Sequence, residues 1–254
     1  MRDLLSNLYV RGIRINKIEE HCYYKELPAV KAIMDMGELT FNTNVTFLVG
    51  ENGIGKSTLI EAIAVALGFN PEGGTKNFSF STNDSHSGLH NHMTVVRSIL
   101  KPHDGFFLRA ESLYNAASYI DEIDSEPEGG AKVIYSYGGT SLHKQSHGES
   151  FLSIVENRFY GHGLYILDEP EAALSPTRLL RLLCDMKNLV DENSQFIIAT
   201  HSPILMAFPG AEVLELTEDG IKCVSYKDTE HYVVTKRFLD APEKMLDELF
   251  KQKE

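Results

Sequence analysis

Three short segments of this 254-residue chain carry residues whose types and spacing suit phosphate chemistry. The first, GENGIGKST at 50–58, matches the pattern GxxxxGK[ST]. Its glycines allow a tight curl in which successive backbone N–H groups face an anion. Lys56 is expected to reach the β- and γ-phosphates, Ser57 to bind Mg²⁺ and Thr58 to contact the α-phosphate. The candidate nucleotide-binding residues of this segment are Gly50, Glu51, Asn52, Gly53, Ile54, Gly55, Lys56, Ser57 and Thr58.

The second segment places two carboxylates directly after the apolar run 164–167. At the C-terminal end of a strand in a parallel sheet, side chains enter the ligand crevice. We therefore predict that Asp168 holds Mg²⁺ through water and that Glu169 polarises the water that attacks the γ-phosphate. Alone, an apolar run ending in Asp-Glu also suits a surface turn. Together with the glycine-rich segment it is strong evidence for phosphate chemistry.

The third segment repeats this pattern with a histidine, because the apolar run 196–199 is followed by Thr200 and His201. An imidazole there can hydrogen-bond the γ-phosphate or orient the attacking water. The alternative is a purely structural histidine at a strand end. We count Glu169, His201 and Lys56 as the candidate catalytic residues.

The elements that must position these residues follow from the apolar pattern. Short apolar strands alternate with helices, which is typical of an α/β fold with a mostly parallel sheet covered on both faces. The glycine-rich segment lies between a strand and a helix, as its motif requires. Expected strands are 8–16, 27–34, 40–50, 105–109, 164–167 and 195–200, and expected helices are 56–68, 112–124, 149–160, 176–190 and 242–251.

Composition excludes several classes of protein. The formal net charge of −12 argues against coating nucleic acid through bulk charge, although a local basic patch remains compatible with it. Three scattered cysteines form no metal-type spacing and fit a reducing cytoplasm. The longest apolar stretch, 59–69, contains Glu61 and is too short to span a bilayer, so we expect no direct membrane insertion.

The order of these segments resembles the ABC-type ATPase superfamily of P-loop NTPases. GENGIGKST is similar to its Walker A motif, LYILDEP to its Walker B motif with the catalytic Glu, and ATHS to its switch-histidine loop. SHGES at 146–150 is similar to its LSGGQ signature. The resemblance covers residues 40–205. Within the superfamily the chain looks most like the soluble SMC/RecF-type branch and small stand-alone bacterial predicted ATPases of the AAA_21 kind.

The resemblance implies one ABC-type ATPase domain over 1–254. Its nucleotide lobe is expected at about 1–69 and 161–225, with antiparallel N-terminal strands, and its helical signature lobe at about 70–160. A charged C-terminal segment, 226–254, is expected to cap the sheet rather than to dock a partner.

The resemblance also implies ATP and Mg²⁺ as cofactors and an ATP-dependent homodimer. In that family the signature helix completes the nucleotide site of a second subunit, which assigns that role to Ser146, Gly148 and Glu149. The simpler alternative is a capped helix start, because Ser146 suits an N-cap.

The chain departs from the family pattern where a glutamine normally couples the two lobes. Its three glutamines are Gln145, Gln195 and Gln252, and none lies between Lys56 and the signature in the place of that coupling glutamine. Glu111 is the candidate replacement, as a ligand of Mg²⁺ or of the attacking water; a solvated or salt-bridged Glu is the equal alternative. Tyr23 and Tyr24 lie where transporter-type members place an adenine-stacking aromatic, but packing in a strand is the preferred role for both.

By analogy with the SMC/RecF-like branch, the expected function is an ATP-driven dimerisation switch in the cytosol. It would serve DNA repair, DNA maintenance or phage defence, with nucleic acid or an effector protein as partner. The alternatives are the ATP-binding subunit of a membrane transporter and an ATP-sensing regulator of a partner effector. The intact Glu169 argues against a sensor that does not hydrolyse ATP.

Overall fold

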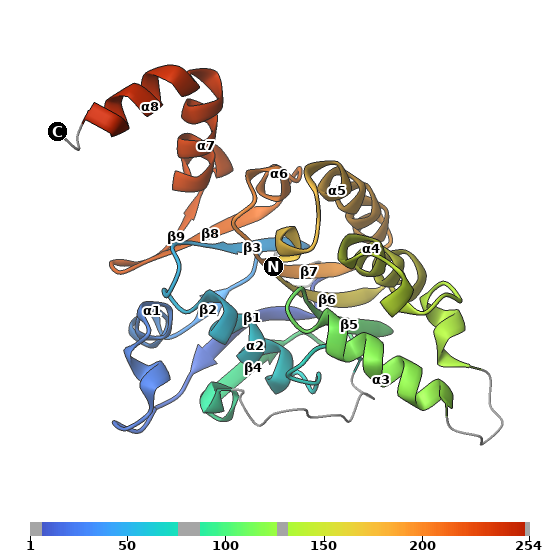
Figure 1. Ribbon diagram of the computed structural model, residues 1–254. Helices are drawn as coiled ribbons and strands as arrows, with labels where there is room; N and C mark the ends of the chain where they lie inside the picture. Colours follow the sequence, from blue (N-terminus) through green and yellow to red (C-terminus); the bar gives the residue numbers. More distant parts are fainter. Residues whose placement is uncertain (1–6, 76–86, 126–131, 252–254) are drawn as a thin grey trace.

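A six-stranded, mostly parallel sheet forms the centre of the computed structural model, which describes residues 7–75, 87–125 and 132–251 (Figure 1). The first five strands in spatial order are parallel, and the last is antiparallel to its neighbour. The predicted α/β class with a mostly parallel sheet is therefore confirmed. The order is β5 (Asp104–Arg109), β6 (Gly163–Asp168), β7 (Gln195–Ala199), β3 (Val45–Val49), β8 (Glu212–Thr217) and β9 (Gly220–Val224).

A smaller antiparallel sheet lies beside it, in the order β2 (Leu39–Thr40), β1 (Val10–Ile15) and β4 (Met93–Arg97). Helix α2 (Lys56–Ala66) lies between the two sheets (Figure 1). Its apolar side chains join those of the small sheet in one core cluster. This arrangement fits the antiparallel N-terminal strands that the resemblance implies.

Helices α3 (Leu113–Ser125), α4 (His147–Arg158), α5 (Pro176–Asp191) and α6 (Pro203–Met206) contribute to a second core cluster. The alternation of side chains along β3 divides the two clusters. Phe47 belongs to the cluster of these helices, whereas Leu48 belongs to the cluster of α2. Short 3₁₀ helices complete the fold at Tyr23–Glu26, Gly88–His92, Val133–Tyr137, Leu142–Lys144, Pro170–Ala172 and Tyr226–Asp228.

The strand expected at 27–34 is wrong, because this segment begins helix α1 (Pro28–Met36). Pro28 occupies the first helical position, where a missing N–H costs nothing. Residues 29, 30, 32 and 33 are all buried on one face, and Gly37 ends the helix with a φ of 78°. The apolar residues of this segment are spaced as on one face of a helix, and Pro28 is a residue type typical of a helix start.

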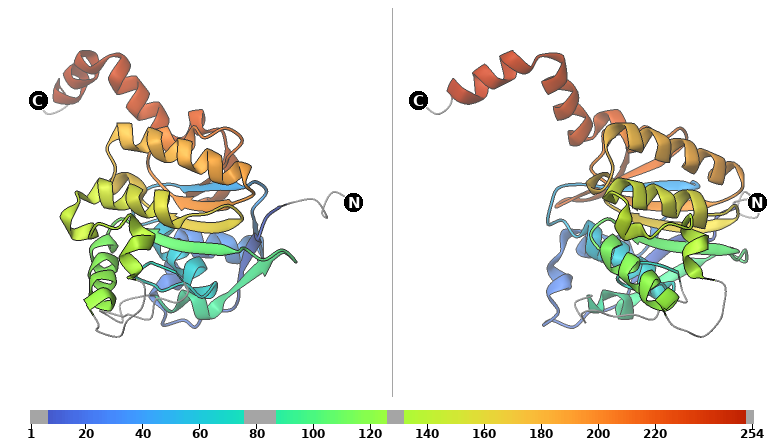
Figure 2. Two further views of the ribbon diagram at one scale, coloured as in Figure 1. Left: turned by 90° about the vertical axis from the view of Figure 1, so that its right-hand side faces the viewer. Right: turned by 45° about the vertical axis from the view of Figure 1, so that its right-hand side comes forward.

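The C-terminal segment does not cap the sheet as expected. It forms α7 (Glu230–Asp240) and α8 (Pro242–Lys251), and no described residue of either helix is buried. Figures 1 and 2 show the pair projecting from the body of the molecule as an arm. Only the base of α7 is anchored, since Thr229 is fully buried and its hydroxyl donates to the carbonyl of Tyr226 at 2.7 Å.

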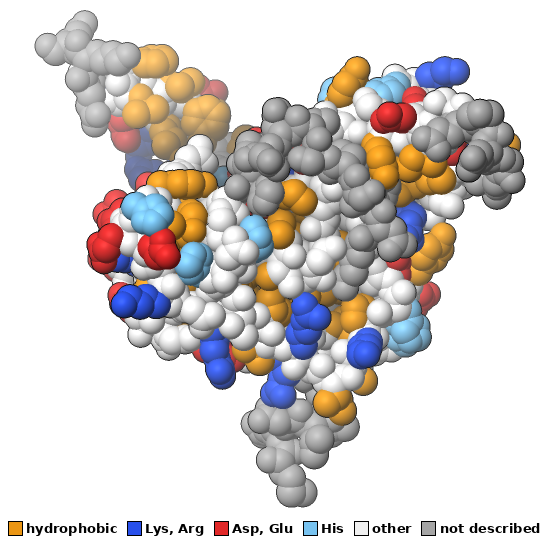
Figure 3. Space-filling view, turned by 90° about the horizontal axis from the view of Figure 1, so that it is seen from below, with side chains coloured by type: hydrophobic (Ala, Val, Ile, Leu, Met, Phe, Trp, Pro, Cys, Tyr) orange, Lys and Arg blue, Asp and Glu red, His pale blue; other side chains and the backbone are white. Residues whose placement is uncertain are grey.

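Charges on the face seen from below are dispersed. In its described part, Lys and Arg side chains stand singly among uncharged ones, and several acidic side chains gather at one side (Figure 3). None of the helices in residues 7–75, 87–125 and 132–251 has the length and apolar character that crossing a membrane requires.

Candidate nucleotide and hydrolysis site

The glycine-rich segment forms a loop between the end of β3 and the start of α2. Gly50, Gly53 and Gly55 have φ angles of 148°, 83° and 105°, in a region that side chains rarely adopt. A Cβ on Gly50 would collide with the carbonyl oxygen of Leu216 on the neighbouring strand β8. The glycines therefore let the loop curl tightly against the sheet, as the sequence predicts.

Lys56 begins α2 and turns its side chain back into this loop. Its Nζ donates to the carbonyl oxygens of Gly50 at 2.7 Å and Glu51 at 2.9 Å, and the residue is only 4% exposed. Burial lowers the pKa of the Lys56 ammonium, while the nearby carboxylates of Glu169, Asp168 and Glu171 raise it. A buried cation is thus held where an anionic ligand would compensate it.

Asp168 is the last residue of β6 and is almost fully buried. Burial raises the pKa of its carboxyl to about 6, against the opposing effects of the Arg109 guanidinium and the Ser57 hydroxyl. Its Oδ1 is buried without a hydrogen-bond partner in the described part of the chain. A buried carboxylate oxygen beside a serine hydroxyl is the kind of oxygen set that Mg²⁺ binds, so these residues fit the predicted cation.

Glu169 follows in the left-handed conformation, with φ 47° and ψ 55°. This conformation is costly for a residue with a side chain and is found most often at functional sites. Its backbone N–H donates to the carbonyl oxygen of Ala199 at 3.0 Å, which ties the end of β6 to the end of β7. The carboxylate Oε1 lies 3.5 Å from Nε2 of His201. The structure therefore brings together the acid and the histidine that the sequence predicts.

Sequence reasoning missed Glu171, which holds the backbone at His201. Glu171 accepts from the backbone N–H of His201 and, at 2.8 Å, from the hydroxyl of Thr200. Burial raises the pKa of its carboxyl, and these hydrogen bonds oppose the rise. No pattern in the segment 170–173 distinguishes this Glu from a surface one, so only the fold reveals its role.

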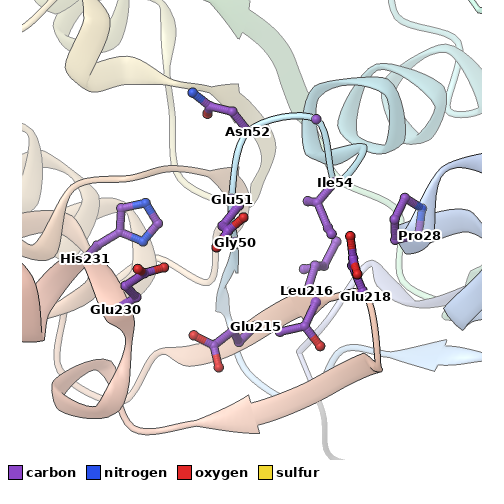
Figure 4. A pocket seen from close by; sticks show the side chains of 12 residues that line it. Pro28, Gly50, Glu51, Asn52, Ile54, Glu215, Leu216, Glu218, Glu230 and His231 are labelled. Carbon is purple, nitrogen blue, oxygen red and sulfur yellow. The ribbon is translucent and has the colours of Figure 1, made fainter.

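Two cavities adjoin the glycine loop. One of about 190 Å³ includes Lys56, Ser57, Thr58 and Glu169 in its lining and is the candidate cradle for phosphate. The other, of about 570 Å³, lies between the loop, β8 and the start of α7 (Figure 4). Its lining is strongly acidic, with carboxylates from the loop, β8, the turn after it and α7; these are Glu51, Glu215, Glu218 and Glu230.

Comparison with known proteins matches two adjacent parts of the chain to family models. Residues 31–137, which contain the glycine loop, match a model described as "AAA domain" (AAA_23). Residues 140–207, which contain SHGES, Asp168, Glu169 and His201, match "AAA domain, putative AbiEii toxin, Type IV TA system" (AAA_21). The second match begins shortly before the signature-like segment, and the two matches follow the expected order of motifs. The chain belongs to the ABC-type ATPase superfamily.

Curated relatives of this ABC-type ATPase include the galactose/methyl galactoside import ATP-binding protein MglA of Escherichia coli K12 and of Shigella flexneri. Each is 24% identical over 197 residues, covering 70% of this chain and 37% of the relative. The chain thus spans little more than a third of the length of these relatives.

Solved structures similar to this ABC-type ATPase include the SMC head domain from Thermotoga maritima, with 14% identity, a TM-score of 0.43 and coverage of 86% of this chain and 99% of that one. Another is cbiO1 from Clostridium perfringens, part of the ABC transporter complex cbiONQ. It has 16% identity, a TM-score of 0.46 and coverage of 95% and 99%.

The signature-like segment of the ABC-type ATPase starts helix α4. Ser146 is its N-cap, and the Glu149 carboxylate accepts from the Ser146 backbone N–H at 2.9 Å and hydroxyl at 2.8 Å. Arg178 on α5 donates to the Ser146 hydroxyl at 3.2 Å and to Glu149 at 3.1 Å. The capped helix start is therefore present. The positive end of the helix dipole lies at the same helix start, so capping and a signature role are compatible.

Glu111 lies near the same edge of the sheet, because β5 and β6 pair with Arg109 opposite Asp168. Its side chain is 84% exposed, and Oε2 lies 3.8 Å from a guanidinium nitrogen of Arg109. Of the two candidate aromatic residues, Tyr24 is buried in the core cluster of α2, whereas Tyr23 is exposed. The predicted strand is wrong for both, because they lie in a 3₁₀ helix, Tyr23–Glu26. Tyr24 does pack in the core, whereas Tyr23 does not, because only one face of this short helix meets the core.

Proposed function

We propose that this ABC-type ATPase binds and hydrolyses ATP with Mg²⁺ and acts as an ATP-driven dimerisation switch. The observation that carries this proposal is the cavity of about 190 Å³ lined by Lys56 and Glu169. Asp168 acts electrostatically on Lys56, and His201 contacts Glu169, so both lie beside this cavity. The loop and the buried lysine supply positive charge, while the carboxylates supply a cation site and a general base. Few other reaction classes need all four groups.

Within this mechanism each residue has one task. Lys56 leaves its two carbonyl partners to bind the β- and γ-phosphates. Ser57 and Asp168 would hold Mg²⁺, which when bound neutralises phosphate charge, and Glu111 would be an outer ligand. Glu169 accepts the proton of the attacking water, and its left-handed backbone aims the carboxylate. His201 hydrogen-bonds the γ-phosphate on the side next to Glu169.

The switch requires a second copy of the chain. In our proposal the helix start with Ser146, Gly148 and Glu149 caps the nucleotide of the partner subunit, as the resemblance implies. The positive end of the α4 dipole attracts the negatively charged γ-phosphate, so loss of this phosphate by hydrolysis weakens the pair of subunits. Binding energy thus shifts a population of dimers, and loss of the γ-phosphate resets it.

The decisive experiment is sizing by light scattering of the Glu169→Gln variant with ATP and Mg²⁺. We expect a stable dimer that requires both ATP and Mg²⁺, because Gln keeps the shape of the site and removes the base. The Lys56→Ala variant is the control and should stay monomeric under the same conditions. A monomeric Glu169→Gln variant that nevertheless binds ATP would overturn the switch. Phosphate release by the wild type, absent from both variants, tests hydrolysis separately.

For the pathway we propose DNA repair, DNA maintenance or phage defence in the cytoplasm, resting on the resemblance to the SMC/RecF-like branch. The dispersed basic side chains in Figure 3 give DNA no continuous surface on the described part of that face. A DNA contact on this face would therefore need the dimer. ATP-dependent DNA binding by Glu169→Gln would support this role. Its absence, together with co-purification of a polytopic membrane protein, would favour the transporter alternative instead.

A further inference from the structure

The base of the C-terminal arm reaches the candidate switch histidine. His231, in the first turn of α7, places its Nε2 2.7 Å from Nδ1 of His201. The two rings lie 4.8 Å apart at an angle of 58°. Figure 4 shows His231 beside Glu230, across the acidic cavity from Ile54 and Pro28. The sequence offered no reason to connect a residue of the charged tail with the hydrolysis site.

The backbone around both rings is well fixed. On one side, the N–H of His201 is bonded to Glu171. On the other, the hydroxyl of buried Thr229 caps α7 by accepting from the N–H of Tyr232 at 3.4 Å. Because each ring stands on a tethered backbone, the contact is a built feature of the fold. It does not depend on the rest of the arm, which is exposed.

A hydrogen bond between two imidazole nitrogens requires one nitrogen to carry a proton and the other to present a lone pair. Burial lowers the pKa of both histidines, and the Lys56 ammonium lowers both further. The neighbouring carboxylates oppose this, namely Glu169 at His201 and Glu230, Glu215 and Glu51 at His231. Neutral rings are therefore favoured at neutral pH, and each ring must take one of two tautomers.

The free nitrogen of His201 decides which tautomer is useful. Its Nε2 is buried, lies 3.5 Å from the Glu169 carboxylate, and has no hydrogen-bond partner within the described residues. If His201 is to donate a hydrogen bond to a γ-phosphate, its proton must be on this Nε2. The Nδ1 must then be the acceptor, and the proton of the 2.7 Å contact must sit on Nε2 of His231.

We propose that His231 is a positioning residue that holds His201 in its Nε2–H tautomer by donating to Nδ1. Without this donor, His201 can place its only proton on Nδ1 and present a lone pair to the γ-phosphate, which repels it. The orienting residue thus comes from the arm, whereas the sheet supplies His201 itself. This inference rests on the proposed function, because it assigns a partner to the histidine of that site.

The test compares three variants of the full chain. His231→Phe keeps an aromatic ring of similar size and removes the donor. His231→Gln retains an amide N–H near the position of Nε2, and Tyr232→Phe is the control on the same helix. We expect His231→Phe to lower kcat for ATP about tenfold with KM changed less than about twofold. His231→Gln should recover most of kcat, and Tyr232→Phe should match the wild type.

The ¹⁵N chemical shifts of the His201 ring give a readout that does not depend on turnover. The wild type should show a protonated Nε2 and a lone pair on Nδ1, and His231→Phe should show the other tautomer or a mixture. Unchanged shifts and unchanged kcat in His231→Phe would overturn the proposal. Equal loss of kcat in the Phe and Gln variants, with unchanged shifts, would also overturn it and show a packing role. If the wild type has no ATPase activity, the proposed function fails while the shifts still test the contact.

Discussion

The Nε atom of Arg109 lies 3.4 Å from Oδ2 of Asp168, so one guanidinium faces the candidate magnesium carboxylate from the neighbouring strand. The same guanidinium bonds Glu61 of helix α2 at 2.9 Å. Arg109 therefore joins the helix that follows the glycine loop to the strand that ends in the acid pair. Both carboxylates are buried, and this arginine is the common positive partner that the structure gives them.

Removal of this arginine should be costly. We expect Arg109→Met to lower the free energy of unfolding by about 3–5 kcal/mol, because it leaves two buried carboxylates without their cation. Urea denaturation measures the change. The control is Arg14→Met, since Arg14 pairs with Glu38 at 2.7 Å but is 57% exposed and should cost less than about 1 kcal/mol. Equal effects of the two substitutions would contradict the bridging role.

Asp168 should make the nucleotide-free protein less stable as the pH rises. Its folded-state pKa is raised from 3.8 to about 6 by burial. A raised acid pKa contributes stability below about pH 4 that is lost as the pH rises through 6, here up to about 3 kcal/mol. Asp168→Asn removes this titration, so the variant should gain stability relative to the wild type between pH 4 and 7. Denaturation in a chelator measures both curves, and parallel curves would refute the assignment.

Two glycines of the loop should differ in their tolerance of a methyl group. A Cβ on Gly50 meets the carbonyl of Leu216, whereas a Cβ on Gly53 finds no heavy atom within 4 Å. Gly53→Ala should cost about 1–2 kcal/mol from its positive φ alone. Gly50→Ala adds a backbone collision, so it should cost more and abolish nucleotide binding. Thermal unfolding and titration with a fluorescent ATP analogue check both, and an equally mild Gly50→Ala would count against the close approach of the loop to β8.

Arg178 should affect association more than folding. It is partly exposed and contacts Ser146 and Glu149 at the start of α4. Loss of an exposed pair costs roughly 0–1 kcal/mol in stability. If this helix start caps a partner's nucleotide, Arg178→Ala should weaken the ATP-dependent dimer of Glu169→Gln several-fold, measured by sedimentation. Arg181→Ala, on the same helix, is the control. A dimer of unchanged affinity would separate Arg178 from the interface.

The acid pair, Asp168 and Glu169, shows what a local sequence pattern can predict. An apolar run followed by Asp168 and Glu169 predicted a strand end, and β6 ends there. The glycine loop was equally predictable because its geometry depends on residues adjacent in the chain. The segment 27–34 shows the limit: an apolar run without clear alternation suits a strand or a helix, and packing against the core selected the helix.

The sequence by itself determined the superfamily, the mostly parallel sheet and the positions of the candidate phosphate-binding residues, because each depends on neighbours within one loop or one strand end. Only the tertiary structure decided that Arg109 faces Asp168, that Glu171 holds the loop of His201 and that His231 touches its ring. These contacts join residues far apart in the chain. They arise from the order of strands in the sheet and from the place where the C-terminal arm leaves the sheet. Neither can be predicted from the spacing of residues within one segment.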